Sequence, residues 1–144
     1  MKETELRRLL ALGEGPRLEF KARVPNIEQL GAIVCGFLNS SGGYLVCGMT
    51  DAGQVQGTTL LEDEMQELEA EVHLKLTPKA LVSFELQQLD GKRLLVVEVP
   101  AGPDAPYAYA NSIFLRDGVA SVEAIRDLVL RRQIEPERWE RRFS

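Results

Sequence analysis

RLEFK at residues 17–21 and FLNSSGGYLVCGMTDAG at residues 37–53 decide the fold of this chain. Apolar and charged residues alternate in the first piece, which predicts a strand with one buried face. The second piece begins in a helix with one apolar face. Gly42-Gly43 predicts the end of this helix, because glycine readily adopts the left-handed C-cap conformation. The apolar residues 44–47 then predict a central strand that is buried on both faces.

Hydrophobic periodicity predicts the remaining elements on either side of these two pieces. Four helices are expected: one at residues 3–12, one that begins at an Asn26 N-cap and ends at Gly42, one at 61–76 and one after Ser121. Further strands are expected at residues 82–86, 93–99 and 112–116. Asp90-Gly91 is a strong hairpin signal between two of these strands. We predict a single compact α+β domain at residues 1–130, with helices packed on a mixed β-sheet, and the start of a further helix or linker at 131–144.

Composition sets limits on the class of protein. The 144 residues are 44% hydrophobic and 27% charged, as expected of a folded domain. No apolar run approaches the roughly 20 residues of a membrane helix, and no signal peptide is evident, so we expect a cytoplasmic protein. Cys35 and Cys47 lie in apolar patterns and are expected to be buried thiols. His73 is the only histidine, which argues against a histidine zinc site or a Ser/His/Asp triad.

Charge is distributed unevenly along the chain. The net charge is −5, but residues 61–90 alone carry eight acidic and two basic residues. Most of these acids follow a helical spacing and predict a solvated helix face. Basic residues lie elsewhere, so an anionic partner would have to bind a local patch.

The glycine-rich segment Ser40-Ser41-Gly42-Gly43 suggests a phosphate-binding loop only superficially. Phosphates bind at helix N-termini, where free N–H groups point outward. These glycines follow a helix, at the negative end of its dipole. No Walker A motif occurs in the chain, so nucleotide binding at this segment is not expected.

Three carboxylates, Glu14, Glu19 and Asp51, are candidates for a catalytic and metal-binding site. If the strands at 17–21 and 44–47 are neighbours, these side chains converge at one rim of the sheet. Such oxygen ligands suit Mg²⁺ or Mn²⁺, which promote phosphodiester cleavage. The alternative is structural: Glu19 pairs with Arg17 or Lys21, and Asp51 caps its own turn.

Basic and aromatic residues form a second candidate site. The residues predicted to contact nucleic acid are Lys21, Arg23, Tyr107 and Arg116. Arg and Lys contact phosphates, and an aromatic ring nearby can stack on a base. The alternative is a solvated edge in which Arg116 forms a structural ion pair with Asp117 or Glu19.

Together the motifs resemble those of the Schlafen-type AlbA-like domain, which is also labelled divergent AAA. The resemblance rests on Glu-Phe-Lys at 19–21, Asn-Ser-Ser-Gly-Gly at 39–43, Pro-Tyr at 106–107 and Phe-Leu-Arg-Asp-Gly at 114–118, and it covers roughly residues 10–130. This domain occurs in bacterial transcriptional-regulator-type proteins and in animal Schlafen proteins. The resemblance implies nucleic-acid binding, with DNA as the expected ligand.

The resemblance also implies an enzymatic alternative. In nuclease members of the Schlafen family, three acids at positions matching Glu14, Glu19 and Asp51 form a metal-dependent ribonuclease site. This chain departs from that pattern, because Thr50 stands where many members have a second acid. The chain also provides one lobe, whereas the nucleases clamp RNA between two.

The function expected from the sequence is therefore a DNA-binding module of a bacterial transcriptional-regulator-like protein, with further domains after residue 144. One alternative is a metal-dependent endoribonuclease lobe. Another is a protein-interaction or homodimerisation module whose acidic helix contacts a basic partner. No cofactor is indicated apart from Mg²⁺ or Mn²⁺ in the ribonuclease alternative, and no membrane association is expected.

Overall fold

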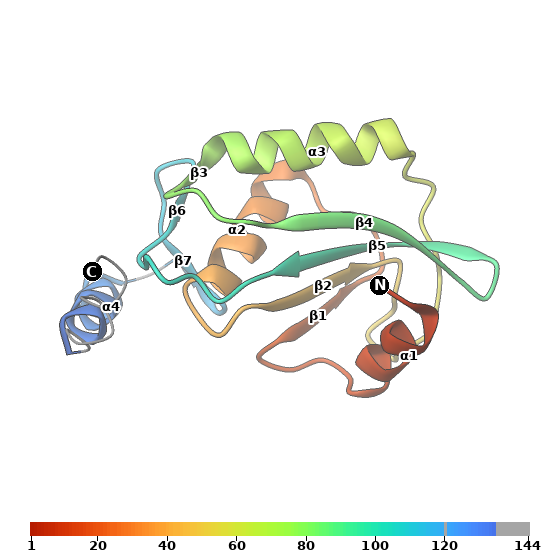
Figure 1. Cartoon of the computed structure of the whole chain (residues 1–144), viewed down its shortest axis with the longest axis horizontal. Coiled ribbons are helices and arrows are strands. Elements are labelled where there is room, and N and C mark those ends of the chain that lie inside the picture. The colour runs from red at the N-terminus through yellow and green to blue at the C-terminus, as the bar shows by residue number, and fades with distance from the viewer. Residues whose placement is uncertain (120, 135–144) are drawn as a thin grey trace.

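The computed structural model describes residues 1–119 and 121–134, and it confirms a compact α+β arrangement with a mixed sheet (Figure 1). The helices are α1 (Glu3–Ala11), α2 (Ile27–Leu38), α3 (Glu62–Lys75) and α4 (Val122–Ile134). The strands are β1 (Leu18–Lys21), β2 (Gly43–Cys47), β3 (Leu76–Thr77), β4 (Ser83–Leu89), β5 (Lys92–Val99), β6 (Ala108–Tyr109), β7 (Phe114–Leu115) and β8 (Gly118–Val119).

The main sheet has four strands in the order β1-β2-β5-β4. β1 and β2 are parallel, with α2 as the crossover between them, and the other neighbours are antiparallel. Two short ribbons, β3 with β6 and β7 with β8, complete the strands of the described chain. The strands at 17–21 and 44–47 are therefore neighbours, which was the condition for Glu14, Glu19 and Asp51 to converge at one rim of the sheet.

Helices cover both faces of the sheet, α2 and α3 on one side and α1 on the other (Figure 1). The two central strands, β2 and β5, supply side chains to both cores in strict alternation, as the apolar run at 44–47 predicts. Leu45, Cys47, Leu95 and Val97 pack under α2 and α3, whereas Val46, Leu94 and Val96 pack with the residues around α1.

Local sequence signals explain where the elements begin and end. The Asn26 side chain caps α2 by accepting the Gln29 N–H at 2.9 Å. Asp90 and Gly91 both have positive φ, 53° and 73°, as a two-residue hairpin between β4 and β5 requires. At the end of α2, Gly42 has φ of 72° and its N–H donates to the Phe37 carbonyl at 2.9 Å.

The C-terminal part differs in detail from the prediction. The expected strand at 112–116 is reduced to the two residues of β7, because the chain turns at Arg116 and Asp117 to pair with β8. α4 begins after Ser121, whose hydroxyl accepts the Ala124 N–H, and it continues to Ile134, past the expected boundary at 130. The rest of the 131–144 segment, residues 135–144, lies outside the described residues. No helix in the described part of the chain is long and apolar enough to cross a membrane.

Gly42 and Gly13 form a matched pair for testing the end of α2. Their φ angles are 72° and 73°, but a Cβ at Gly42 would lie 2.6 Å from the Val99 carbonyl oxygen, whereas a Cβ at Gly13 meets nothing within 4 Å. Gly13→Ala is therefore expected to cost about 1 kcal/mol from the left-handed backbone alone. Gly42→Ala is expected to cost about 3 kcal/mol or more, because the backbone of Val99 to Ala101 must also shift.

Chemical denaturation of both variants measures this difference. Equal losses of unfolding free energy would contradict the close packing of Gly42 against the end of β5.

Candidate functional site

A buried amide positions the segment that carries Arg116. Asn39, only 5% exposed, lies at the end of α2. Its Nδ2 donates to the carbonyls of Tyr107 and Phe114 at 2.9 and 2.8 Å, and its Oδ1 accepts the Tyr107 N–H at 2.7 Å. The residues of the 107–114 segment are thereby fixed against α2. The packing is close, since a Cβ at Gly36 would lie 2.8 Å from the Leu115 carbonyl oxygen.

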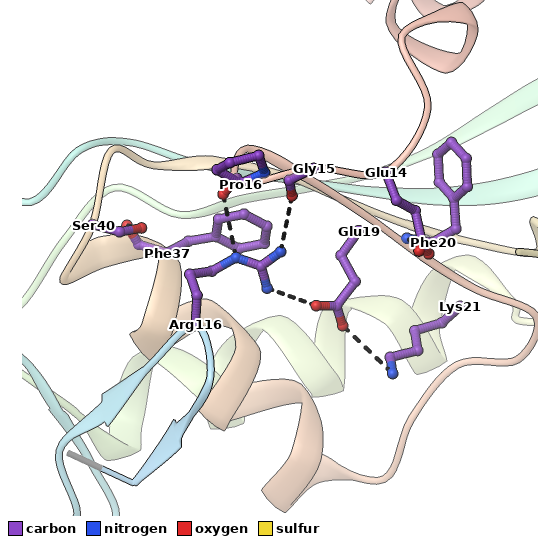
Figure 2. A network of polar contacts seen from close by, with 9 residues as sticks. All are labelled: Glu14, Gly15, Pro16, Glu19, Phe20, Lys21, Phe37, Ser40 and Arg116. Carbon is purple, nitrogen blue, oxygen red and sulfur yellow. Dashed lines mark hydrogen bonds and ion pairs between the residues drawn. The ribbon is translucent and has the colours of Figure 1, made fainter. Parts of the chain in front are cut away.

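Arg116, two residues after the last of these contacts, joins that segment to β1. Its Nη1 donates to Glu19 Oε1 at 2.6 Å, and its Nε and Nη2 donate to the carbonyls of Pro16 and Gly15, each at 3.3 Å (Figure 2). The guanidinium also lies over the Phe37 ring, 4.0 Å from its centroid. Arginine can make several hydrogen bonds and stack on a ring at the same time because its guanidinium is planar and carries five N–H donors, whereas lysine cannot.

Glu19 is consequently paired on both oxygens. Besides the bond to Arg116, its Oε2 lies 3.5 Å from Lys21 Nζ. The Glu19 side chain is 20% exposed and the Lys21 side chain 35% exposed. The structural alternative for Glu19 is thus what the structure shows, with Lys21 and Arg116 as the two partners.

Glu14 has a backbone partner. Its Oε1 accepts the Phe20 N–H at 3.0 Å, on the outer edge of β1 (Figure 2). A glutamate also binds an N–H of the opposite edge strand, β4: Glu69 Oε2 accepts the Phe84 N–H at 3.1 Å. A carboxylate bound to an edge N–H blocks the pairing of another strand at that point. Glu14 therefore protects a sheet edge.

Asp51 lies in an exposed turn after β2. The turn is closed by Thr50, whose hydroxyl accepts the Gln54 N–H and whose carbonyl accepts the Gly53 N–H. The expectation that Asp51 caps its own turn is therefore wrong, because Thr50 provides the hydrogen bonds.

The carboxylates do not form a donor set for a divalent cation. Within residues 1–119 and 121–134, no group of three or more His, Cys, Asp or Glu side chains is arranged to hold a metal ion. The partners of Glu14 and Glu19 explain this for two of the three acids, since a hydrogen-bond donor or a cation already engages their oxygens. The residues present do not fit the Mg²⁺ or Mn²⁺ site that the family resemblance implies.

The residues predicted to contact nucleic acid separate into two groups. Lys21 is half-buried and Arg23 is exposed, so both cations reach the surface. Arg116 is 23% exposed, but its guanidinium is engaged by Glu19 and backbone carbonyls. The prediction that Tyr107 contacts nucleic acid is wrong, because Tyr107 is 1% exposed and its hydroxyl accepts the Asp104 N–H at 3.2 Å.

The two cysteines are buried, as expected. Burial raises the pKa of the Cys47 thiol to about 12, and the nearby Glu19 carboxylate adds to the shift. Burial also raises the pKa of the Cys35 thiol, whose Sγ donates to the Tyr107 carbonyl. Both thiols are therefore protonated at neutral pH and neither is a nucleophile.

The role of Asn39 was not predicted from the sequence. The signal was present, because Asn39 lies four residues after Cys35 and so continues the apolar side of α2 with a polar residue. A polar residue at such a position is buried and must find hydrogen-bond partners.

Comparisons with known proteins place the chain in a family. The family model described as "Schlafen, AlbA_2" matches residues 14–125, which is most of the chain, so the chain belongs to that family. The match spans β1 to the first turn of α4, and so includes the Glu19–Arg116 contact. No curated protein is similar enough to this chain to count as a relative.

Two solved structures have the same fold. One is the N-terminal domain of a protein from Nitrosomonas europaea that bears the name ATP-dependent DNA helicase RecG-related protein. It has 25% identity and a TM-score of 0.56, over 84% of this chain and 92% of that domain. The other is the DIP2311 protein from Corynebacterium diphtheriae, with 18% identity and a TM-score of 0.59 over 83% of this chain. This chain spans 29% of the length of DIP2311.

Arg116 variants test whether the guanidinium holds the fold together. Arg116→Ala is expected to lower the unfolding free energy by about 2–3 kcal/mol, because a half-buried charged hydrogen-bond set is lost and the Glu19 carboxylate loses its principal partner. Arg116→Lys is expected to recover less than half of that loss, because an ammonium cannot reach Glu19 and both carbonyls while stacking on Phe37.

Urea denaturation with the Glu19→Gln and Arg116→Ala double-mutant cycle checks the pair itself. A coupling energy near zero would show that the Glu19–Arg116 contact contributes nothing to stability, and full recovery by lysine would contradict the requirement for a guanidinium.

Proposed function

We propose that this chain is a nucleic-acid-binding domain, with DNA as its ligand, and that it binds the phosphate backbone through the exposed cations around β1. The observation that carries the proposal is the local charge at β1. Residues 14–23 together with Arg116 contain four basic and two acidic residues, a net charge of +2 in a chain whose total is −5.

The arrangement of these charges supports phosphate binding. Alternation along the strand puts Arg17, Glu19 and Lys21 on the same face. The Glu19 carboxylate is neutralised by its two partners, and Glu14 is bound to the edge N–H of Phe20. The cations Arg17 and Arg23 are exposed. Lys21, beside Glu19, is 35% exposed and also reaches the surface. Cations that reach the surface can replace counterions on a nucleic-acid backbone.

Membership of the Schlafen, AlbA_2 family supports the same proposal. The similarity to the N-terminal domain of the RecG-related protein, at 25% identity, adds to it, since that protein's name relates it to an ATP-dependent DNA helicase. We extend the proposal to the setting in which the domain works: a module of a larger, cytoplasmic, bacterial protein of the transcriptional-regulator type. Backbone contacts of this kind carry no sequence information, so the remaining parts of such a protein would select the target.

Charge-removing variants at the end of β1 and just after it provide the test. Arg23→Gln and Lys21→Gln are each expected to weaken binding of a labelled DNA duplex several-fold and to reduce the slope of log K against log salt by about 1, because each removes one phosphate contact. Arg126→Gln is the matched control, since Arg126 is exposed on α4 and the substitution changes the charge equally. Fluorescence anisotropy at several salt concentrations gives both quantities.

Two outcomes would overturn the proposal. One is that the wild-type chain binds neither DNA nor RNA at low salt. The other is that binding shows no salt dependence and that all three variants behave alike, which would favour the protein-interaction alternative.

A further inference from the structure

A shallow polar depression lies at the end of the sheet where the β4–β5 hairpin begins. Its volume is about 360 Å³, and it is open to solvent. Two segments line it, the loop after β2 and the hairpin: Gln56, Gly57, Thr58, Thr59, Gln88, Gly91, Lys92 and Arg93. None of these eight residues is acidic, although the chain contains 22 Asp and Glu residues.

The loop side of the depression is held by hydrogen bonds from both neighbouring strands. The Gly48 carbonyl accepts the N–H groups of Gln56 and Gly57 at 2.7 and 2.9 Å. The Thr58 N–H donates to the Arg93 carbonyl at 2.8 Å. Lys92 Nζ donates to the Val55 carbonyl at 3.2 Å. The loop is therefore built onto the start of β5 and is not a free excursion.

The side chains of the depression carry more N–H and O–H donors than are engaged in hydrogen bonds within the protein. Arg93 donates one N–H, from Nη1, to the Leu60 carbonyl at 2.8 Å, and an arginine carries five. Lys92 uses one of its three. The exposed side chains of Gln56, Thr59 and Gln88 add further amide and hydroxyl donors. The nearest turn carboxylate, Asp90, is bound by Arg7 at 2.8 Å and does not line the depression.

The depression and the cations of β1 belong to the same end of the sheet. The Lys21 carbonyl accepts the Gly48 N–H at 2.7 Å, and Gly48 in turn holds the loop. Lys21 lies opposite Cys47, and Cys47 lies opposite Leu95, two residues from Arg93 on the same face of β5. Two strand spacings and two residues along a strand separate Lys21 and Arg93 by roughly 12 Å between Cα atoms. A nucleic-acid strand covers that distance in about three or four nucleotides, at 3.4 Å each.

The geometry points to this depression as a second phosphate-binding subsite, which takes a phosphodiester of the same nucleic acid that contacts Lys21 and Arg23. This assignment of the ligand rests on the proposed function. An uncharged rim of hydroxyl and amide donors around two cations suits an anion with several acceptor oxygens. An open depression admits a continuous strand, whereas a small-molecule site would enclose its ligand.

A matched pair at Thr59 tests the subsite. Thr59 is exposed, and Thr59→Glu places a carboxylate in the depression without removing a hydrogen bond, whereas Thr59→Gln adds similar bulk without charge. We expect Thr59→Glu to weaken DNA binding by about tenfold, because a carboxylate repels the phosphate. Lys92→Gln is expected to reduce the salt slope by about 1. Thr59→Gln and the control Arg126→Gln should bind as the wild type does.

DNA binding by these variants, together with amide shifts in an NMR titration with inorganic phosphate, distinguishes failure of the subsite from failure of the proposed function. If Thr59→Glu and Lys92→Gln bind DNA like the wild type while Arg23→Gln binds weakly, the subsite is overturned and the proposed function stands. If the wild type binds no nucleic acid, the proposed function fails. In that case phosphate-dependent shifts at Gly57 to Thr59 and Gly91 would support an anion subsite, and their absence would overturn it.

Discussion

The buried Asn39 amide is the interaction on which the site depends. It holds the backbone of Tyr107 and Phe114 against the end of α2, and so determines where Arg116, two residues later, can reach. From that position the guanidinium stacks on Phe37 and bonds to Glu19. Because Glu19 is then paired by two cations, the carboxylate most suggestive of catalysis contributes to the fold. A satisfied buried amide of this kind specifies one arrangement, since any other would leave polar groups unpaired.

Carboxylates also have structural roles at both edges of the sheet. Glu14 and Glu69 each bind an outward-facing N–H, on β1 and β4, the two edge strands. Acidic residues that seem available in the sequence are thus used to cap and pair backbone and side-chain donors. With these acids engaged, the positive charge around β1 and the hairpin start is left to face solvent. An acidic chain can in this way present a local surface suited to phosphate.

The sequence was sufficient to predict the α+β fold, the α2 cap and stop, the two-sided burial of the strand at 44–47, and the Asp90-Gly91 hairpin, because each depends on local periodicity or turn chemistry. It was not sufficient for Tyr107, whose position in a Pro/Gly loop suggested exposure although long-range packing buries it. Two partners were expected for Arg116, Asp117 or Glu19. The structure shows Glu19, which lies 97 residues away in sequence, and no local pattern could indicate such a contact. The Lys92–Arg93 depression forms only when the loop after β2 meets β5, which no local pattern indicates.

The Glu19 carboxylate serves the fold, and we have proposed that nucleic acid binds the surrounding cations without a metal. Binding of labelled duplex DNA and RNA by Glu19→Gln, measured in EDTA, tests it most directly. The account predicts that the wild type binds in EDTA and that Glu19→Gln binds as tightly or more tightly, because one negative charge near phosphate is removed. Binding that requires Mn²⁺ and is lost in Glu19→Gln would contradict the account and favour a metal-dependent ribonuclease.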